Sequence, residues 1–271
     1  MKVENWNEIS NKAMQWTKEA GEIILSSFSE ERMINFKSNP SDLVTDMDQK
    51  TEQFFIEKIK STYPTHKILG EEGFGDEVTS QEGTLWIIDP IDGTMNFVHQ
   101  QRNFAISIGI YQDGVGKVGI IYDVVAGELF HCIVGSGAYL NEVALPKLNS
   151  VPLSEAVIGL NSTWVTENKR IDAEVLAPLV KAVRGTRSYG SAAIEMAYVA
   201  SGRLDAYMTL RLSPWDFAAG ILLIQEVSGV ATNLYGKPIK LLQQNPVFVG
   251  KPVLHDEILH HFILKQSADH E

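Results

Sequence analysis

The sequence predicts a mixed α/β fold of the α+β class, with an antiparallel sheet in the N-terminal lobe and a second sheet covered by helices in the C-terminal lobe. Between residues 104 and 134, alternating apolar segments are separated by glycine-bearing turns, which is typical of antiparallel hairpins. From residue 156 onward, short apolar segments alternate with longer segments of helical periodicity, which is typical of a sheet packed against helices. The pattern loosens around Pro146 and Pro152, so we expect two lobes, 1–146 and 147–271.

Each element of the first lobe is predicted from its periodicity. Residues 4–28 carry an apolar stripe at helical spacing that includes Trp6, Ala13 and Trp16, which predicts an amphipathic helix. Thr45-x-x-Asp48 resembles a capping box and predicts the start of a second helix. Short alternating or apolar segments predict strands at 33–37, 66–70, 85–88, 104–111, 117–122 and 128–134.

In the second lobe, strands and helices alternate along the chain. The predicted strands are 156–160, 183–187, 204–208, 229–233 and 247–249, and the predicted helices are 166–181, 191–201, 214–224 and one from about residue 253. Pro214 is well placed to begin the third of these helices, because proline is favoured in a first helical turn.

Composition excludes several functional classes. The net charge of −11 argues against general binding to nucleic acid or to anionic membranes, which both require basic patches. We expect no membrane-spanning segment and no signal peptide, since no apolar run is long enough and the first residues are polar. The single cysteine, Cys132, excludes an internal disulfide framework and favours a cytoplasmic location.

The most informative segment is 84–98, TLWIIDPIDGTMNFV. Its apolar run predicts a buried strand, which we expect to end at Pro90 because proline cannot donate to a sheet ladder. Asp89 and Asp92 therefore lie at the end of a strand, and two adjacent carboxylates repel each other unless a cation lies between them. Oxygen ligands favour Mg²⁺ or Ca²⁺. The N–H groups of Gly93 and Thr94, at the start of a following helix, would attract an anion. The segment thus indicates metal-assisted chemistry on a phosphate.

Other motifs are less informative. Residues 114–119 match the G-x-G-x-x-G pattern of dinucleotide-binding proteins, but a strand-like segment follows where a helix should begin, so we interpret them as a hairpin turn. The histidines lack zinc-ligand spacing, and no serine lies in a G-x-S-x-G motif. These patterns argue against a nicotinamide oxidoreductase, a zinc enzyme and a serine hydrolase.

Three motifs together resemble the inositol monophosphatase family. They are Gly70-Glu71-Glu72, the run from Trp86 to Thr94 with Asn96-Phe97 behind it, and Trp215-Asp216-Phe217-Ala218-Ala219-Gly220. They occur in the family's order and at similar spacing across nearly the whole chain. The resemblance implies a layered α-β-α-β-α sandwich, a Mg²⁺-dependent and lithium-sensitive phosphatase acting on a small-molecule phosphate ester, and a homodimer.

The resemblance also implies the roles of individual residues. Two or three Mg²⁺ ions would be held by Glu71, Asp89, the Ile91 carbonyl, Asp92 and Asp216. Glu71 would take a proton from the attacking water, together with Thr94 supported by Asp48. The proposed substrate-contacting residues are Asp92, Gly93, Thr94, Gly190, Ser191, Ala192, Thr209, Arg211 and Lys37.

Two of these aspartates also have purely structural interpretations. Asp48 can serve only as the helix-capping partner of Thr45, and Asp216 can serve only as a first-turn acid that complements a helix dipole. The resemblance favours a functional role for both. The small residues after Asp216 would allow its helix to approach the central strand closely.

The substrate is the least determined property. Thr209 occupies the position where inositol-specific members of the family carry a glutamate that contacts sugar hydroxyls. Arg211, Arg187 and Arg203 could accommodate a second phosphate or could simply be solvated at the surface. We therefore expect myo-inositol-1-phosphate as the first candidate, with NADP(H) and fructose-1,6-bisphosphate as alternative or additional substrates.

Overall fold

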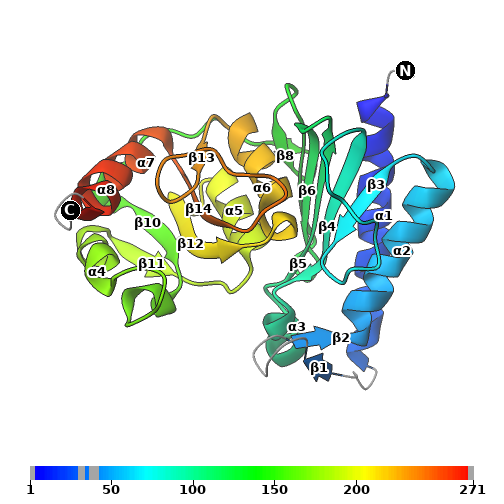
Figure 1. Cartoon of the computed structure of the whole chain (residues 1–271), viewed down its shortest axis with the longest axis horizontal. Coiled ribbons are helices and arrows are strands. Elements are labelled where there is room, and N and C mark those ends of the chain that lie inside the picture. Colours follow the sequence, from blue (N-terminus) through cyan, green and yellow to red (C-terminus); the bar gives the residue numbers. More distant parts are fainter. Residues whose placement is uncertain (1–3, 30–33, 37–42, 268–271) are drawn as a thin grey trace.

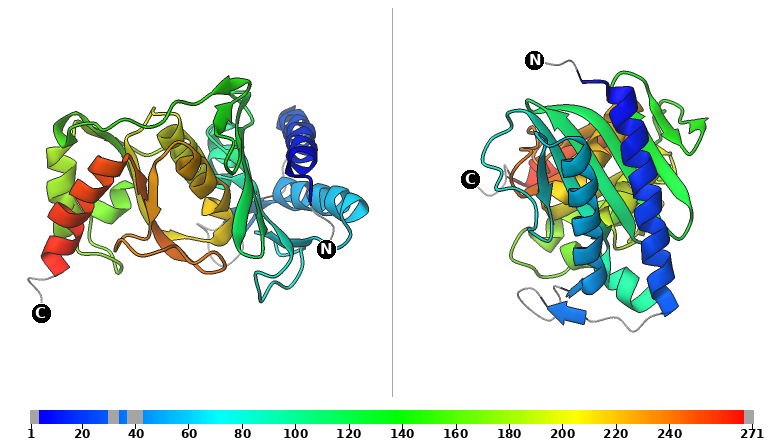
Figure 2. Two further views of the ribbon diagram at one scale, coloured as in Figure 1. Left: turned by 90° about the horizontal axis from the view of Figure 1, so that it is seen from above. Right: turned by 90° about the vertical axis from the view of Figure 1, so that its right-hand side faces the viewer.

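The computed structural model describes residues 4–29, 34–36 and 43–267, arranged in five layers, α-β-α-β-α (Figures 1 and 2). The layered order expected from the family resemblance is confirmed. The elements in chain order are α1 (Trp6–Ser26), a 3₁₀ turn (Ser27–Ser29), β1 (Ile34–Phe36), β2 (Leu43–Thr45), α2 (Asp46–Thr62), β3 (Lys67–Gly70), β4 (Thr84–Asp92), α3 (Thr94–Gln100), β5 (Ala105–Gln112), β6 (Val115–Asp123), β7 (Glu128–Ile133), β8 (Ala138–Leu140), β9 (Val143–Ala144), a 3₁₀ turn (Leu153–Glu155), β10 (Val157–Leu160), a 3₁₀ turn (Ser162–Val165), α4 (Ala173–Ala182), β11 (Gly185–Arg187), α5 (Ala192–Ala200), β12 (Ala206–Leu212), α6 (Pro214–Glu226), β13 (Val230–Thr232), β14 (Asn245–Gly250), α7 (Pro252–Ile258), a π-helical segment (Leu259–Ile263) and α8 (Leu264–Ser267).

The first sheet has seven strands in the order β3-β4-β5-β6-β7-β8-β9. It is antiparallel except for the parallel pair β3–β4. β4 is buried along its whole length, and its side chains alternate between two cores. Leu85 and Ile87 pack towards the middle layer, whereas Trp86 and Ile88 pack towards α1 and α2. A strand buried on both faces explains why its sequence is a continuous apolar run.

Helices α1 and α2 cover the outer face of this sheet (Figure 2). The predicted aromatic stripe of α1 packs in the core, where the Trp16 ring lies 6.0 Å from the Trp86 ring. Lys37, one of the residues expected to contact the substrate, lies outside the described residues.

The middle layer consists of α5 and α6, which lie between the two sheets (Figure 1). Small residues allow α6 to approach the seven-stranded sheet at backbone contact distance. A Cβ atom on Gly109 would lie 2.8 Å from the Ala218 Cβ, and one on Gly119 would lie 2.8 Å from the Ala219 carbonyl oxygen. The Tyr111 hydroxyl donates to the Ala218 carbonyl at 2.7 Å, which fixes the helix on the sheet. This confirms the close approach expected from the Ala-Ala-Gly sequence.

The second sheet has five strands in the order β11-β10-β12-β14-β13, with parallel pairs β11–β10 and β10–β12 and antiparallel pairs elsewhere. Its outer face packs against α4, α7 and the segment after α7. The two sheets fall on either side of residue 146, and the division into lobes at that point stays a prediction. Within the described ranges, each helix is too short or too polar to cross a bilayer.

Some predicted boundaries were wrong. The helix expected at 166–181 begins only at Ala173, because the Asp172 side chain caps it by accepting from the Glu174 amide. The strand expected at 204–208 is β12, which continues to Leu212. The last two strands at one side of the seven-stranded sheet, β8 and the edge strand β9, were not predicted. Residues 114–119 lie at a hairpin rather than in a dinucleotide-binding loop, but the turn itself is shorter than expected, because Gln112 pairs with Val115 and residues 115–119 already belong to β6.

Candidate active site

Strand β4 carries Asp89 and Asp92 to one end of the seven-stranded sheet. Contrary to expectation, the strand does not end at Pro90 but continues to Asp92. Its pairing with β5 shifts register between Asp89 and Asp92, so Pro90 lies where the ladder is interrupted and its missing N–H costs no hydrogen bond. The irregularity is further stabilised by Asp89, whose Oδ1 accepts the Ile91 amide at 3.0 Å.

A third carboxylate reaches the same place from α6. Asp216 is the third residue of that helix, and its Oδ2 accepts the Ser213 amide at 2.7 Å in a capping box. Carboxylate oxygens of Asp89, Asp92 and Asp216 all lie within 4.8 Å of one another. The close packing of α6 on the sheet thus joins residues more than 120 positions apart in sequence.

The electrostatics of this cluster are dominated by burial and like charge. Burial raises the pKa values of Asp89 and Asp216 well above their ordinary range, and the neighbouring carboxylates raise them further. Burial also raises the pKa of Asp92 to about 6, even though Asp92 accepts hydrogen bonds from the Ser191 hydroxyl and from the Ala193 amide at 2.7 Å. The charged forms therefore need a compensating positive charge.

Glu71 belongs to the same cluster. It follows the end of β3, and its amide donates to the Ile88 carbonyl of β4 at 3.3 Å. Its side chain raises the pKa values of Asp89, Asp92 and Asp216 through its charge, and it also shares a hydrogen bond with Asp89. Glu71 therefore lies beside the three aspartates, although it is not one of the side chains whose oxygens all lie within 4.8 Å of one another.

The donor set fits a hard divalent cation. All four side chains offer only carboxylate oxygens, the ligands that Mg²⁺ and Ca²⁺ prefer. Close carboxylates in a buried site repel one another when ionised, and a bound cation removes that cost. Arg211 is a nearby cation that lowers the pKa of Asp216, but it is exposed, so it offsets only a small part of the repulsion.

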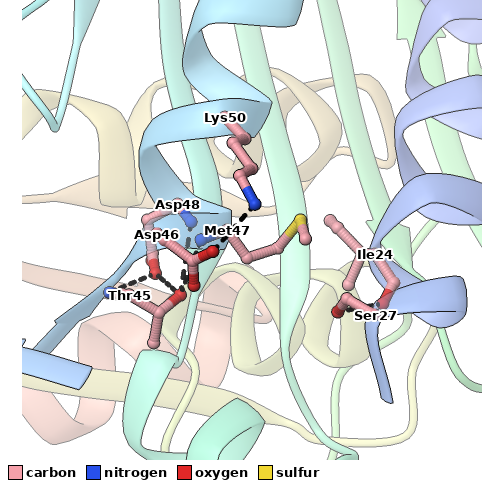
Figure 3. Close-up of polar contacts among 7 residues, drawn as sticks. All are labelled: Ile24, Ser27, Thr45, Asp46, Met47, Asp48 and Lys50. Carbon is pink, nitrogen blue, oxygen red and sulfur yellow. Dashed lines mark hydrogen bonds and ion pairs between the residues drawn. The ribbon is translucent and has the colours of Figure 1, made fainter. Parts of the chain in front are cut away.

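Thr94 and Asp48 form a second polar group beside the cluster. Thr94 Oγ1 lies 3.2 Å from both Asp48 Oδ1 and the Ile91 carbonyl oxygen. Asp48 Oδ2 accepts the Thr45 amide at 2.8 Å and the Thr45 hydroxyl, which completes the capping box of α2 (Figure 3). Burial raises the pKa of Asp48 to about 6, although these hydrogen bonds act in the opposite direction. Asp48 is therefore both a cap and a partner of Thr94.

A cavity of about 240 Å³ extends from the acidic cluster. Its lining includes the predicted residues Gly190, Ser191, Ala192 and Thr209 together with Asp92 and Asp216. Gly93 lies close to it, because a Cβ on that residue would be 3.2 Å from the Ser191 Cβ, and its φ of 95° also favours glycine.

The arginines considered for a second phosphate do not belong to this cavity. Arg211 is exposed on β12 and is not among the lining residues. Arg203 forms a two-point ion pair with Glu128 and stacks over the Tyr198 ring at 5.0 Å. Arg187 is exposed, and its guanidinium donates to the Thr186 carbonyl at 2.9 Å.

Several buried residues at or near the site were not predicted from the sequence. Glu195 on α5 is buried, its Oε1 accepts the Tyr189 amide at 2.6 Å, and burial raises its pKa to about 7. It lines the cavity together with Tyr207 and Trp164. The sequence did contain a signal for Glu195, since it is a lone charge in an otherwise apolar helix. Glu52, buried on α2, was also missed, although it lies one helical turn after Asp48.

Known proteins resemble this chain over nearly its whole length. The model of the inositol monophosphatase family matches residues 5–266. An inositol-1-monophosphatase of Bacillus subtilis (strain 168) is 57% identical over 259 residues, covering 96% of this chain and 98% of that protein. A crystal structure of SaIMPase-II bound to inositol monophosphate shares 42% identity with a TM-score of 0.87 and covers 96% of both chains. A crystal structure of an IMPase/NADP phosphatase with Mg²⁺ and phosphate shares 27% identity with a TM-score of 0.87, covering 94% of this chain and 95% of that one.

Proposed function

The chain belongs to the inositol monophosphatase family, and from this premise we propose that it is a Mg²⁺-dependent phosphomonoesterase whose first substrate is myo-inositol-1-phosphate. The observation that carries the proposal is the convergence of Asp89, Asp92 and Asp216, with carboxylate oxygens within 4.8 Å of one another beside a cavity. Relatives that bind inositol monophosphate, or Mg²⁺ and phosphate, support it.

The proposed metal ligands are the carboxylates of Glu71, Asp89, Asp92 and Asp216 and the carbonyl oxygen of Ile91, which together would hold two or three Mg²⁺ ions. When bound there, Mg²⁺ would supply a water of lowered pKa and would neutralise charge on the phosphate and the leaving oxygen. The oxygen-only donor set and the mutual repulsion of the buried carboxylates support this assignment.

The chain's own groups would handle the proton. In this proposal a carboxylate oxygen of Glu71 accepts a proton from the attacking water. The Thr94 hydroxyl orients that water, and its own hydrogen is directed to Asp48 Oδ1 or to the Ile91 carbonyl, each 3.2 Å away. The amides of Gly93 and Thr94 would hold phosphate oxygens, and the Gly190–Ala192 backbone would contact the alcohol part of the substrate.

Two alternative activities differ in their support. NADP(H) phosphatase activity is favoured by Thr209, which replaces a carboxylate by a small hydroxyl, and by the likeness to an IMPase/NADP phosphatase. Fructose-1,6-bisphosphatase activity requires a place for a second phosphate. Arg203 is engaged by Glu128, and Arg211 is exposed outside the cavity lining, so this activity is the weaker candidate.

The proposal is tested by phosphate release from inositol-1-phosphate, NADP⁺ and fructose-1,6-bisphosphate. Each substrate is measured with Mg²⁺, with Mg²⁺ and lithium, and with EDTA, using Asp89→Asn as the matched control. We expect release from inositol-1-phosphate only with Mg²⁺, inhibition by lithium, and little activity in Asp89→Asn. Release in EDTA, or full activity of a folded Asp89→Asn protein, would overturn the proposal.

Substrate preference is tested at Thr209. The Thr209→Glu variant places a carboxylate where it can accept hydrogen bonds from a polyol, and it repels a second phosphate. We expect kcat/KM for inositol-1-phosphate relative to NADP⁺ to rise by roughly tenfold, the value of a single hydrogen bond to a charged group. The ratio of the two kcat/KM values is the readout, with Thr209→Gln as the uncharged control. An unchanged ratio would contradict the assignment of this pocket.

We also propose a homodimer and a cytoplasmic location. The homodimer rests on the family resemblance alone. The location is supported by the single cysteine, Cys132, which is buried in β7. Sedimentation of the purified protein tests the first of these, and cell fractionation tests the second.

A further inference from the structure

The segment that follows β3 is held by a buried carboxylate from α2. Glu52 is completely buried, and its two oxygens accept two different backbone amides. Oε2 accepts the Glu72 amide at 2.7 Å, and Oε1 accepts the Phe74 amide at 2.8 Å. Hydrogen bonds from amides to a charged carboxylate are about twice as strong as neutral ones. Glu52 therefore fixes the backbone immediately after Glu71.

Gly70 completes this arrangement on the other side of Glu71. A Cβ atom on Gly70 would lie 2.3 Å from Glu52 Oε2 and 2.4 Å from its carboxyl carbon. The backbone of Gly70 is not in the left-handed region, so its conformation does not itself demand glycine. The carboxylate of Glu52 occupies the space that a side chain would need. Glycine at this position is thus explained by Glu52.

Glu71 lies between two fixed points. Its own amide donates to the Ile88 carbonyl of β4 at 3.3 Å, one residue before Asp89, and the next amide is bound by Glu52. We propose that Glu52 is a positioning residue, which directs the Glu71 carboxylate towards the metal cluster by fixing the backbone at residues 72 and 74. This inference rests on the proposed metal-dependent function and names a residue that acts through Glu71.

Asp76 provides a matched control. It anchors the far end of the same segment, where its Oδ2 accepts the Ile68 amide at 2.8 Å and pairs with Lys60 at 2.7 Å. Lys60, like Glu52, belongs to α2, so both contacts join this helix to the segment after β3. Of these two carboxylates, Glu52 is the one that binds the amide of the residue adjacent to Glu71. A purely structural role would make the two contacts equivalent in their effect on metal binding.

The first test compares Glu52→Gln with Asp76→Asn. Glutamine keeps the size but replaces one acceptor oxygen by an NH₂ group that cannot accept from an amide. Mg²⁺ affinity is measured from the rise of the unfolding temperature with Mg²⁺ concentration, which requires no substrate. We expect Glu52→Gln to weaken Mg²⁺ affinity by roughly 10–100-fold, as is typical for partners that orient metal ligands. Asp76→Asn should lower the unfolding temperature but leave Mg²⁺ affinity near that of the wild type.

The second test uses Gly70→Ala, because the added methyl group displaces the Glu52 carboxylate. Alone, it should weaken Mg²⁺ affinity in the same direction as Glu52→Gln. In a Glu52→Ala background the steric conflict is absent, so Gly70→Ala should have little further effect. Unchanged Mg²⁺ affinity in the folded Glu52→Gln and Gly70→Ala proteins would overturn the inference. It would also be overturned if Gly70→Ala weakened Mg²⁺ affinity as much in the Glu52→Ala background as in the wild type. These tests measure Mg²⁺ affinity and not hydrolysis. If the wild type binds Mg²⁺ but hydrolyses none of the substrates, the proposed activity is wrong, and the role of Glu52 in Mg²⁺ binding is still decided by the variants.

Discussion

Helices α2 and α6 begin with the same local motif, and both motifs deliver an aspartate to the site. Each helix follows a hydroxyl-bearing residue, Thr45 or Ser213, and carries an aspartate at its third position. In both, one aspartate oxygen accepts the amide of the hydroxyl-bearing residue, at 2.8 Å for Asp48 and 2.7 Å for Asp216. The two helices therefore have the same capping arrangement at their N-termini.

The two aspartates differ in what their other carboxylate oxygen faces. Asp48 Oδ1 is directed to the Thr94 hydroxyl, whereas Asp216 presents an oxygen to Asp89 and Asp92. A capping box requires only one of the two carboxylate oxygens. The structural and functional interpretations of these aspartates are thus compatible, because one side chain can serve both.

The largest effect should come from Asp216→Asn. The amide oxygen can still accept from the Ser213 N–H, so the helix start is kept while one charge leaves the acidic cluster. We expect Mg²⁺-dependent phosphate release to fall more than roughly 100-fold, beyond the loss typical of residues that only orient a ligand. The unfolding temperature in EDTA should not fall, since removing one carboxylate relieves the repulsion within the acidic cluster. Activity within a factor of about ten of the wild type would contradict the ligand assignment.

The next largest effect is expected in the pH dependence of the unfolding free energy, through the charge of Asp48. Its folded-state pKa of about 6 lies above the ordinary value of 3.8, so the folded protein retains a proton that the unfolded chain has lost. This contribution to stability is complete below pH 3.8 and is lost as the pH rises through about 6. Asp48→Asn removes the dependence, so the variant should gain up to about 3 kcal/mol relative to the wild type between pH 4 and pH 7. Urea unfolding in EDTA measures it, and an equal stability difference at both pH values would contradict it.

A smaller effect is expected on catalysis by the same variant. Asp48→Asn weakens the hold on the Thr94 hydroxyl without removing a proposed metal ligand. We expect kcat at saturating Mg²⁺ to fall by roughly tenfold, with little change in Mg²⁺ affinity. Thr94→Val should act similarly, and the double variant should lose no more than either single variant. A large fall in Mg²⁺ affinity would contradict this expectation, because it would indicate that Asp48 is a metal ligand, as is proposed for Asp216.

The smallest effect is expected at the cap itself. Thr45→Ala removes the hydroxyl that accepts from the Met47 amide at 3.2 Å, and it should cost about 1 kcal/mol of unfolding free energy. Thr45→Ser keeps the hydroxyl and is the control. If the two variants were equally stable, the cap would contribute nothing through its side chain.

Much of the fold was predictable because the local and global patterns agree. The apolar run of β4, the glycine-bearing hairpins and the stripe of α1 each predicted an element that is present. The errors occurred where tertiary pairing overrides local preference. Pro90 should end a strand, but it lies at a register shift where no ladder hydrogen bond is required.

The acidic residues of the site could be predicted, but their surroundings could not. Asp89, Asp92 and Asp216 stand in recognisable motifs, whereas their closeness depends on how α6 packs against the sheet. Glu52 belongs to no motif, since its role arises from two backbone amides that fold back onto it. Neither spacing nor composition encodes that contact.

The central position of α6 leads us to expect a particular course of heat inactivation. This helix contacts strands of both sheets, and its first turn carries Asp216. Segments that open locally are those with few buried contacts, and α6 is the opposite case. Inactivation by heat should therefore coincide with cooperative melting of the whole molecule. Slow hydrogen exchange of the backbone amides along α6 would then show that Asp216 rarely separates from the other acidic residues of the site.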